Sequence, residues 1–374
     1  MEVMLNNVES ISLSNNDFSI ELYSKLSELD GSIFFSPISI HIVMFMASIG
    51  AATQTYDEIL KTIHLTKKNS TKLLENYEQL LDDLTENNVL KFAIGIFIDD
   101  SFKIKHKYVE NTSHYLKSTT AKLNFKEKAE DQRILINKWV ESKTNGRINN
   151  LLPFGSISKD SSLILANAVH FNSSWQYKFS NIQNEFFYIS PSQKKYVSMM
   201  NLNRHLNYFH DKILKYSVVE LPYKDYNFKM VIMLPDANDG LRNLELNLSK
   251  INIKDLTKKL KTFDVNVKLP QFQLELSYDL KNTLIEMGCS TMFTKNANFS
   301  NILVSLEKTL FVNKIVHKSY IEVNKDGTEA ASSTGVYIQP LAGHRAVNFH
   351  ADHPFMFVIA SQKNDIIFMG RFNP

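Results

Sequence analysis

The sequence predicts an α+β fold in one large domain. Helical signals fill the first part of the chain, whereas strand signals dominate from Leu163 to the C-terminus. Helices in one part and strands in another are typical of α+β proteins. Length alone favours about two domains of about 150 residues each. However, no repeat, low-complexity linker or change of composition divides the chain, so we predict a single domain over residues 1–374.

The helical signals come from caps and from the spacing of apolar residues. Asp17 can cap a helix whose apolar residues, from Phe18 onward, fall on one face. Ser36 followed by Pro37 opens a helix over 38–49 that is apolar nearly all round and is therefore predicted to be buried. The capping box at 55–58 begins the next helix. Further helices are predicted at 71–84 and 132–143.

The strand signals are apolar runs and alternating patterns. Buried strands are predicted at 163–171 and 228–234, and an alternating strand at 90–98. The segment 265–276 alternates cleanly but contains Pro270, which predicts a sheet edge or a bulge there. A closing hairpin is predicted from 355–359 and 366–372.

Composition excludes several classes of protein. Of the 374 residues, 44% are hydrophobic and 22% are charged, which is typical of a globular chain and excludes a disordered one. The single cysteine, Cys289, excludes an internal disulfide and a multi-cysteine metal site. We expect a buried, inert thiol there, because nothing nearby in the sequence would lower its pKa. A net charge of +3 is too small to indicate nucleic acid or an anionic membrane as the main partner.

The common catalytic motifs are absent. The sequence contains no nucleotide-binding glycine motif, no zinc-protease helix and no nucleophile elbow, so a hydrolase is disfavoured and we expect no enzymatic activity. His350 and His353 are predicted to be structural rather than metal ligands, because Pro354 blocks a helix that would bring both to one face. Clustered lysines at 254–261 are interpreted as a solvated helix face, with a polyanion site as the weaker alternative.

One segment, 323–345, does not fit an ordinary surface loop. It is long, rich in small residues and lies between two apolar blocks. Alternate residues from Thr328 to Thr334 are small and uncharged, and no proline occurs from Thr328 to Gln339. The segment could therefore join a sheet as a central strand. An exposed flexible loop is the alternative interpretation.

Seven motifs occur in a fixed order along the chain: Phe34 to Ile40, Asn137 to Ile148, Asn167 to Trp175, Val316 to Lys318, Gly327 to Ala331, Ala351 to Phe355, and Phe368 to Arg371. Through these motifs the chain resembles the serpin family along nearly its whole length. The resemblance implies the serpin fold, with three β-sheets, about nine helices and an exposed reactive-centre loop at about 324–345.

The resemblance implies a serine protease inhibitor that acts as a suicide substrate. The protease attacks the loop, which then inserts as a new strand and traps the acyl-enzyme. The family hinge corresponds to Gly327, Thr328, Glu329, Ala330, Ala331, Ser332, Ser333 and Thr334. Small hinge residues favour this inhibitor over a non-inhibitory carrier, chaperone or storage serpin. The resemblance also implies a monomer without a cofactor or metal.

Three sets of residues carry roles over from the family. Ser36, Ser39, Asn167 and His317 match the shutter, a polar cluster beneath the opening sheet, and should form one hydrogen-bonded network. Trp175 matches the breach, where insertion starts. The family commonly has an acidic residue where this chain has Lys325, which puts the family's hinge salt bridge in doubt.

Two counts place the reactive bond at Leu341–Ala342. Family spacing puts it fourteen residues after Gly327 and eight before Phe349, and both counts give Leu341. Arg345 is the rival, but it requires four more residues on the hinge side. Leucine fits the apolar pocket of chymotrypsin-like or elastase-like proteases. Papain-like cysteine proteases are the second choice, since Pro340 suits them poorly.

The expected compartment depends on whether this chain is a mature form. The first 19 residues lack the basic start, apolar run and cleavage site of a secretory signal. The chain as it stands is therefore expected in the cytoplasm, whereas a mature form of a secreted serpin would be extracellular.

Overall fold

The computed structural model describes residues 7–66, 70–224, 227–305, 307–328 and 346–374. These ranges contain nine α-helices and sixteen β-strands, which confirms the predicted α+β class. The chain divides into two compact units, each built from three separate stretches. Unit 1 is Met1–Leu22, Phe35–His170 and Leu276–Tyr320, and unit 2 is Tyr23–Phe34, Phe171–Glu275 and Ile321–Pro374. The single domain stays a prediction.

Unit 1 holds most of the helices. Its elements are α1 (Asn7–Leu26), α2 (Pro37–Gly50), α3 (Thr53–Thr62), α4 (Ser70–Thr85), β2 (Leu90–Asp99), α5 (His106–Tyr115), β3 (Thr119–Leu123), α6 (Phe125–Lys143), β4 (Leu163–Phe171), α9 (Lys281–Glu286) and β12 (Val312–Asn324). Three of these elements, α1, β4 and β12, end in residues that are assigned to unit 2.

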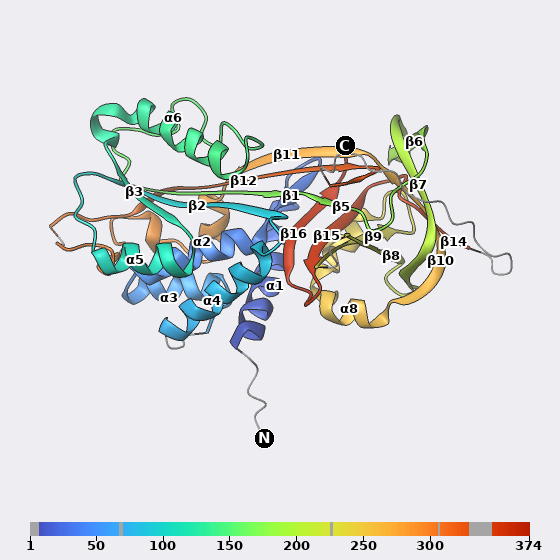
Figure 1. The fold of residues 1–374 in the computed structure, drawn as a ribbon, viewed down its shortest axis with the longest axis horizontal. Helices are drawn as coiled ribbons and strands as arrows, with labels where there is room; N and C mark the ends of the chain where they lie inside the picture. The colour runs from blue at the N-terminus through green and yellow to red at the C-terminus, as the bar shows by residue number, and fades with distance from the viewer. Residues whose placement is uncertain (1–6, 67–69, 225–226, 306, 329–345) are drawn as a thin grey trace, which may run out of the picture. The chain divides into compact units, whose positions relative to one another are not determined.

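Helices cover both faces of the strands in unit 1. Figure 1 shows α6 on one side of β2 and β3, and α2, α3, α4 and α5 on the other. Nearly every residue of α2 is buried, as its all-apolar sequence predicts. On the other face, the Trp139 ring of α6 packs edge-on against Phe97, with the ring centres 5.2 Å apart. Gly95 permits this approach, because a Cβ there would lie 2.7 Å from the Trp139 ring.

Unit 2 holds most of the strands. Its elements are β1 (Ile33–Phe35), β5 (Ser173–Ser174), β6 (Ile182–Ser190), β7 (Gln193–Asp211), β8 (Tyr216–Pro222), β9 (Phe228–Pro235), α7 (Leu241–Leu246), α8 (Ile253–Lys259), β10 (Lys261–Pro270), β11 (Phe272–Asp279), β13 (Gly327–Thr328), β14 (Val347–His350), β15 (Phe355–Ser361) and β16 (Ile366–Phe372). Strands β1 and β11 also extend into unit 1, through Phe35 and residues 276–279.

Hydrogen bonds join the described strands into two networks. One has nine strands in the order β1-β16-β15-β9-β8-β7-β10-β14, with β6 also paired to β7. The other has seven, in the order β3-β2-β4-β12-β13-β5, with β11 also paired to β12. The nine-stranded network is continuous because β7 is 19 residues long and pairs with β6, β10 and β8 along successive parts of its length.

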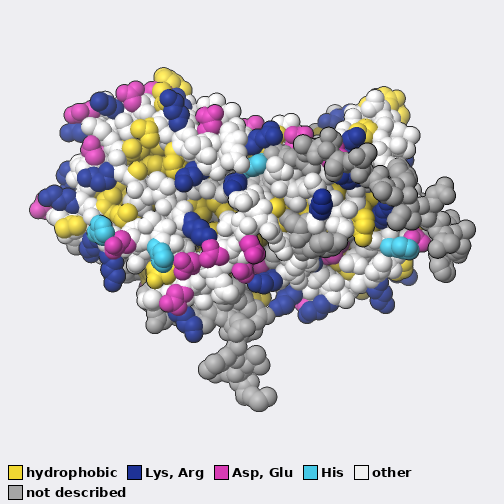
Figure 2. Space-filling model, in the orientation of Figure 1, with side chains coloured by type: hydrophobic (Ala, Val, Ile, Leu, Met, Phe, Trp, Pro, Cys, Tyr) yellow, Lys and Arg dark blue, Asp and Glu magenta, His cyan; other side chains and the backbone are white. Residues whose placement is uncertain are grey.

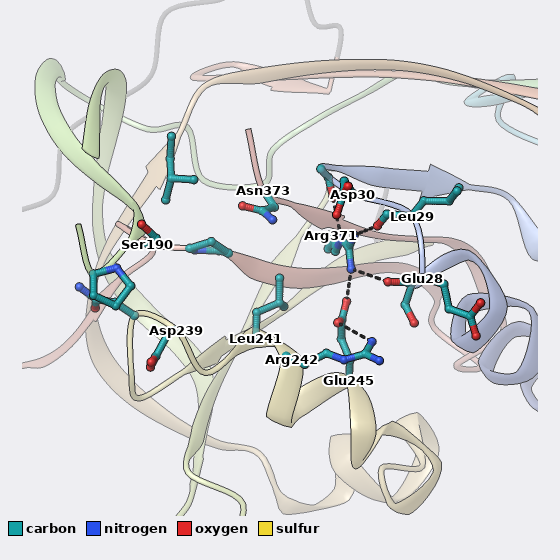
Figure 3. A pocket seen from close by; sticks show the side chains of 16 residues that line it. Glu28, Leu29, Asp30, Ser190, Asp239, Leu241, Arg242, Glu245, Arg371 and Asn373 are labelled. Atoms are coloured by element: carbon teal, nitrogen blue, oxygen red, sulfur yellow. Dashed lines mark hydrogen bonds and ion pairs between the residues drawn. The ribbon is translucent and has the colours of Figure 1, made fainter. Parts of the chain in front are cut away.

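A buried ion pair organises one end of unit 2. The Arg371 guanidinium on β16 lies 2.7 Å from the Glu245 carboxylate on α7. It also donates to the backbone carbonyls of Ser27, Leu29 and Gly31. Figure 3 shows Arg371 between Glu245 and this stretch, at the wall of a hollow of about 530 Å³. One side chain therefore holds together three segments that are distant in sequence.

Two of the predicted helices begin elsewhere. The helix predicted from Asp17 begins by Asn7 instead, because Ile11 extends the buried face toward the N-terminus. The capping box at 55–58 does not begin its helix, since α3 starts at Thr53. The Thr55 hydroxyl accepts the Asn298 N–H, and the Glu58 carboxylate accepts those of residues 290 and 291. Both side chains therefore bind another segment of unit 1.

Two further boundaries differ from the prediction. The helix predicted at 132–143 begins at Phe125, where the Asn124 side chain accepts the Glu127 N–H, and it kinks at Lys128. The segment 265–276 forms two strands, β10 and β11, which are separated at Gln271. Pro270 therefore ends a strand rather than bulging within one, since it lacks the N–H that would continue the ladder.

Among the described residues, no helix is long and apolar enough to cross a membrane. The surface carries charges of both signs. On the face drawn in Figure 2, Lys and Arg side chains are interspersed with Asp and Glu. This mixture is consistent with the small net charge of +3.

Candidate functional site

The structure brings the four predicted shutter residues together in unit 1. Asn167 on β4 and His317 on β12 are register partners in the parallel pairing of these strands. His317 Nδ1 lies 2.5 Å from Asn167 Oδ1, and the Ser36 N–H donates to His317 Nε2 at 3.0 Å. The Ser39 hydroxyl lies 2.8 Å from Asn167 Oδ1, and Asn167 Nδ2 donates to the Ser39 carbonyl. The polar cluster therefore ties β4 to β12 and both to the start of α2.

These contacts determine which ring nitrogen of His317 carries the proton. Its Nε2 accepts a backbone N–H, so the proton of the neutral ring sits on Nδ1 and is donated to Asn167. The side chain is fully buried, and this burial lowers the pKa of His317 from 6.5 to about 3. A second buried histidine, His41 on α2, accepts from the Tyr77 hydroxyl at Nδ1. Burial lowers the pKa of His41 to about 3, although its hydrogen bond with the Ile63 carbonyl opposes this shift.

Mild acid is therefore expected to destabilise the protein. The unfolded chain binds a proton at each histidine near pH 6.5, whereas the folded chain does so only near pH 3. Stability is thus fully present above pH 6.5 and falls as the pH drops through this window. Each histidine should contribute a loss of about 1.4 kcal/mol at pH 5.5. Thermal midpoints at pH 7.5 and 5.5 measure this loss.

A variant at one of the buried histidines tests the cause. His317→Gln removes one of the two buried groups and should reduce the pH dependence. A wild-type midpoint that does not move between pH 7.5 and 5.5 contradicts the prediction.

The predicted breach residue, Trp175, lies beside the start of the 323–345 segment in unit 2. Its indole N–H donates to the Asn324 carbonyl at 2.9 Å, and its ring stacks on Tyr223 with the centres 4.5 Å apart. The Tyr223 hydroxyl lies 2.8 Å from the Thr328 hydroxyl. Sequence reasoning missed Tyr223. Tyr223 directly follows β8 and forms a bridge with Trp175. That pairing exists only in the folded chain, so the sequence carries no signal for it.

Gly327 and Thr328 form a short strand at this point. β13 pairs antiparallel with β12 through Val323 and Asn324, and with β5 through Ser173 and Ser174. A Cβ on Gly327 would lie 2.4 Å from the Ser173 carbonyl oxygen, so this close approach requires glycine. Thr328 is fully buried.

An ion pair that the sequence did not predict lies beside β13. Lys178 Nζ lies 2.9 Å from the Asp326 carboxylate, and both side chains are mostly buried. The family acid expected at the position of Lys325 is absent, but the neighbouring residue, Asp326, supplies a carboxylate. The predicted hinge begins at Gly327 and assigns no role to Asp326, so the sequence reasoning missed this residue.

The other predicted residues have simpler outcomes. Hinge residues 329–334, the reactive pair Leu341 and Ala342, and the rival Arg345 lie outside the described residues. His353 has a partner at each ring nitrogen, the Asp352 carboxylate and the Pro235 carbonyl. Among the described residues, no cluster of three or more His, Cys, Asp or Glu could hold a metal. Cys289 is buried, and burial raises its pKa to about 12, as expected of an inert thiol.

Comparisons with known proteins identify the family of this chain. The family described as serpin (serine protease inhibitor) matches residues 13–374. Serpin B10 of Otolemur garnettii is 33% identical, covering 98% of this chain and 99% of its own. Leukocyte elastase inhibitor of Xenopus tropicalis is 34% identical, covering 98% and 100%. The crystal structure of Serpin48 from Tenebrio molitor superposes with a TM-score of 0.89 at 27% identity, covering 98% of each chain. The chain therefore belongs to the serpin family.

Proposed function

We propose that the protein inhibits chymotrypsin-like or elastase-like serine proteases as a suicide substrate. Relatives named leukocyte elastase inhibitor that are 32–34% identical over nearly the whole chain support this class of target. The uncharged, small residues of the hinge support an inhibitory rather than a storage or carrier role. The protein would act as a monomer, since one loop captures one protease.

The observation that carries the proposal is the position of β13. This strand already pairs on one side with β12 and on the other with β5, and β5 follows β4 after a single residue. A strand that continued from Thr328 would therefore run between β4 and β12, antiparallel to both. These two strands now pair directly with each other. Insertion would have to part them at the Asn167–His317 contact.

The proposed reaction begins as ordinary proteolysis. The protease serine attacks the Leu341 carbonyl, the Leu341–Ala342 amide bond breaks, and the proton passes to the departing amine of Ala342. The Leu341 carbonyl is left as an ester on the protease. Insertion of the freed hinge then competes with attack of water on that ester. The inhibitor is effective when insertion is faster.

Replacing Leu341 by arginine should transfer inhibition to trypsin-like enzymes. An apolar pocket accepts leucine, whereas the buried aspartate of the trypsin pocket needs a cation. Wild-type protein should form a covalent complex with chymotrypsin or elastase that survives denaturing gel electrophoresis. Leu341→Arg should form this complex with trypsin instead.

The released C-terminal fragment identifies the reactive bond. A fragment that starts at Ala342 supports Leu341, whereas a trypsin complex of the wild-type protein with a fragment starting at Ala346 makes Arg345 the reactive residue. Cleavage without any covalent complex, across serine and papain-like proteases, would overturn the inhibitory proposal and favour a non-inhibitory serpin.

A further inference from the structure

A hollow of about 340 Å³ opens in unit 1 where three helices end. The turns after α4, α5 and α6 line it through Asn88, Lys117 and Asn145, and β2 supplies much of the remaining wall. Each of these three turn residues has a positive φ, between 50° and 57°, which directs the chain away from its helix. The volume lies within the range of about 300–1,000 Å³ that is typical of pockets for small organic molecules.

Part of the lining of this hollow is apolar. Leu81, Leu90, Ile94 and Leu116 all line it, and each is at most 3% exposed as a whole residue. They come from α4, β2 and the turn after α5, so the apolar wall is built by three elements. A hydrocarbon group placed against them would leave water, which favours binding at about 25 cal/mol per Å².

The charged part of the lining is cationic. Lys91, Lys117 and Lys143 line the hollow, and no Asp or Glu does. Lys91 donates to the Asn88 side chain, and Lys117 is paired with Asp82, which lies outside the lining. The Lys143 ammonium has neither a hydrogen-bond nor an ion-pair partner among the described residues. At least one ammonium group is thus available to an anion.

Helix dipoles compete with this preference. Each helix C-terminus carries about half a negative charge, which favours cations. However, some of the last carbonyls of two of these helices already accept backbone donors. The Val140 and Glu141 carbonyls of α6 accept the backbone N–H groups of residues 144 and 146. The Thr112 carbonyl of α5 accepts those of residues 116 and 118. These carbonyls therefore do not require the lysines as partners.

We propose that this hollow binds a small amphipathic carboxylate of the medium-chain fatty acid type. The hydrocarbon chain would lie against the apolar wall, and the carboxylate would lie between Lys91 and Lys143. The site is separate from β13 and the shutter residues, and its ligand is not a protease.

Decanoate is the probe for this site, and calorimetric titration of the intact protein, below the micelle concentration, is the measurement. We expect saturable one-to-one binding. Lys143→Glu and Lys91→Glu should each weaken binding about tenfold or more, since each replaces an attraction by a repulsion. Ser142→Trp should abolish binding by filling the hollow from α6, with an unchanged thermal midpoint showing that the variant folds.

Lys138→Glu is the matched control. It makes the same charge change on an exposed residue of α6 outside the lining, so it should leave decanoate affinity unchanged. Equal weakening by Lys138→Glu would show general surface electrostatics and overturn the proposal. Tighter binding of decyltrimethylammonium than of decanoate would show that the helix termini dominate, and would also overturn it. No protease is present, so the outcome is independent of the proposed inhibition.

Discussion

Arginine at Thr334 or Ala330 is expected to convert the protein from an inhibitor into a substrate of its target protease. Side chains alternate between the two faces of a strand. Thr328 is fully buried in β13, so residues 330, 332 and 334 would face the same way in a strand that continued from it. An unpaired charge buried there costs several kcal/mol. Because each 1.4 kcal/mol in a barrier slows a step tenfold, insertion should lose its race with hydrolysis.

The measurement for the hinge variants is the number of inhibitor molecules consumed per protease trapped. This number should rise by about tenfold or more for Thr334→Arg, with cleavage after Leu341 retained. Ser333→Arg is the matched control, because residue 333 would face the opposite side of the inserted strand from Thr334. That side already carries the charged residue Glu329. If Thr334→Arg traps protease at the wild-type ratio, the inserting-strand mechanism is wrong.

Local patterns predicted the buried elements well. The helix at 38–49 and the strand at 163–171 lie within one residue of the observed α2 and β4, because a long apolar run can be satisfied only by burial. The capping box at 55–58 failed for the opposite reason. Thr55 and Glu58 have polar side chains that can satisfy either their own helix or a distant segment, and the sequence does not indicate which.

The candidate site also combines features that could be predicted with features that required the structure. Ser39, Asn167 and His317 could be grouped in advance only through the resemblance to a family, because they are 128 and 150 residues apart in sequence. The tautomer of His317, the stacking of Tyr223 on Trp175 and the Lys178–Asp326 pair required the structure, because each depends on which strands are neighbours. No local periodicity carries that information.

The buried Arg371–Glu245 pair was also missed by the sequence, and its loss is expected to have the largest effect on stability. The two side chains are only 6% and 3% exposed, so water cannot replace a lost partner. The Tyr23 hydroxyl donates to the same Glu245 oxygen at 2.8 Å. Removing the carboxylate would leave the charge of a buried guanidinium uncompensated and would remove one acceptor of the Tyr23 hydroxyl.

Glu245→Leu is expected to destabilise the protein by about 3–5 kcal/mol, the usual cost of breaking a buried ion pair from one side. Glu245→Gln should cost less, since its amide oxygen can still accept from Arg371 and Tyr23. Tyr23→Phe should cost least, at about 1 kcal/mol, because it removes one hydrogen bond and no charge. Thermal or denaturant midpoints of the three variants give this order directly.

An exposed ion pair provides the comparison. Asp255 and Lys258 on α8 are 63% and 67% exposed, so Asp255→Asn should leave the midpoint unchanged within error. If Glu245→Leu lowers stability no more than Asp255→Asn does, the pair contributes nothing and the backbone contacts of Arg371 alone hold the 27–31 stretch. If Glu245→Gln costs as much as Glu245→Leu, the loss comes from the charge on Glu245 rather than from its hydrogen bonds. The three variants thus separate charge from hydrogen bonding at one buried site.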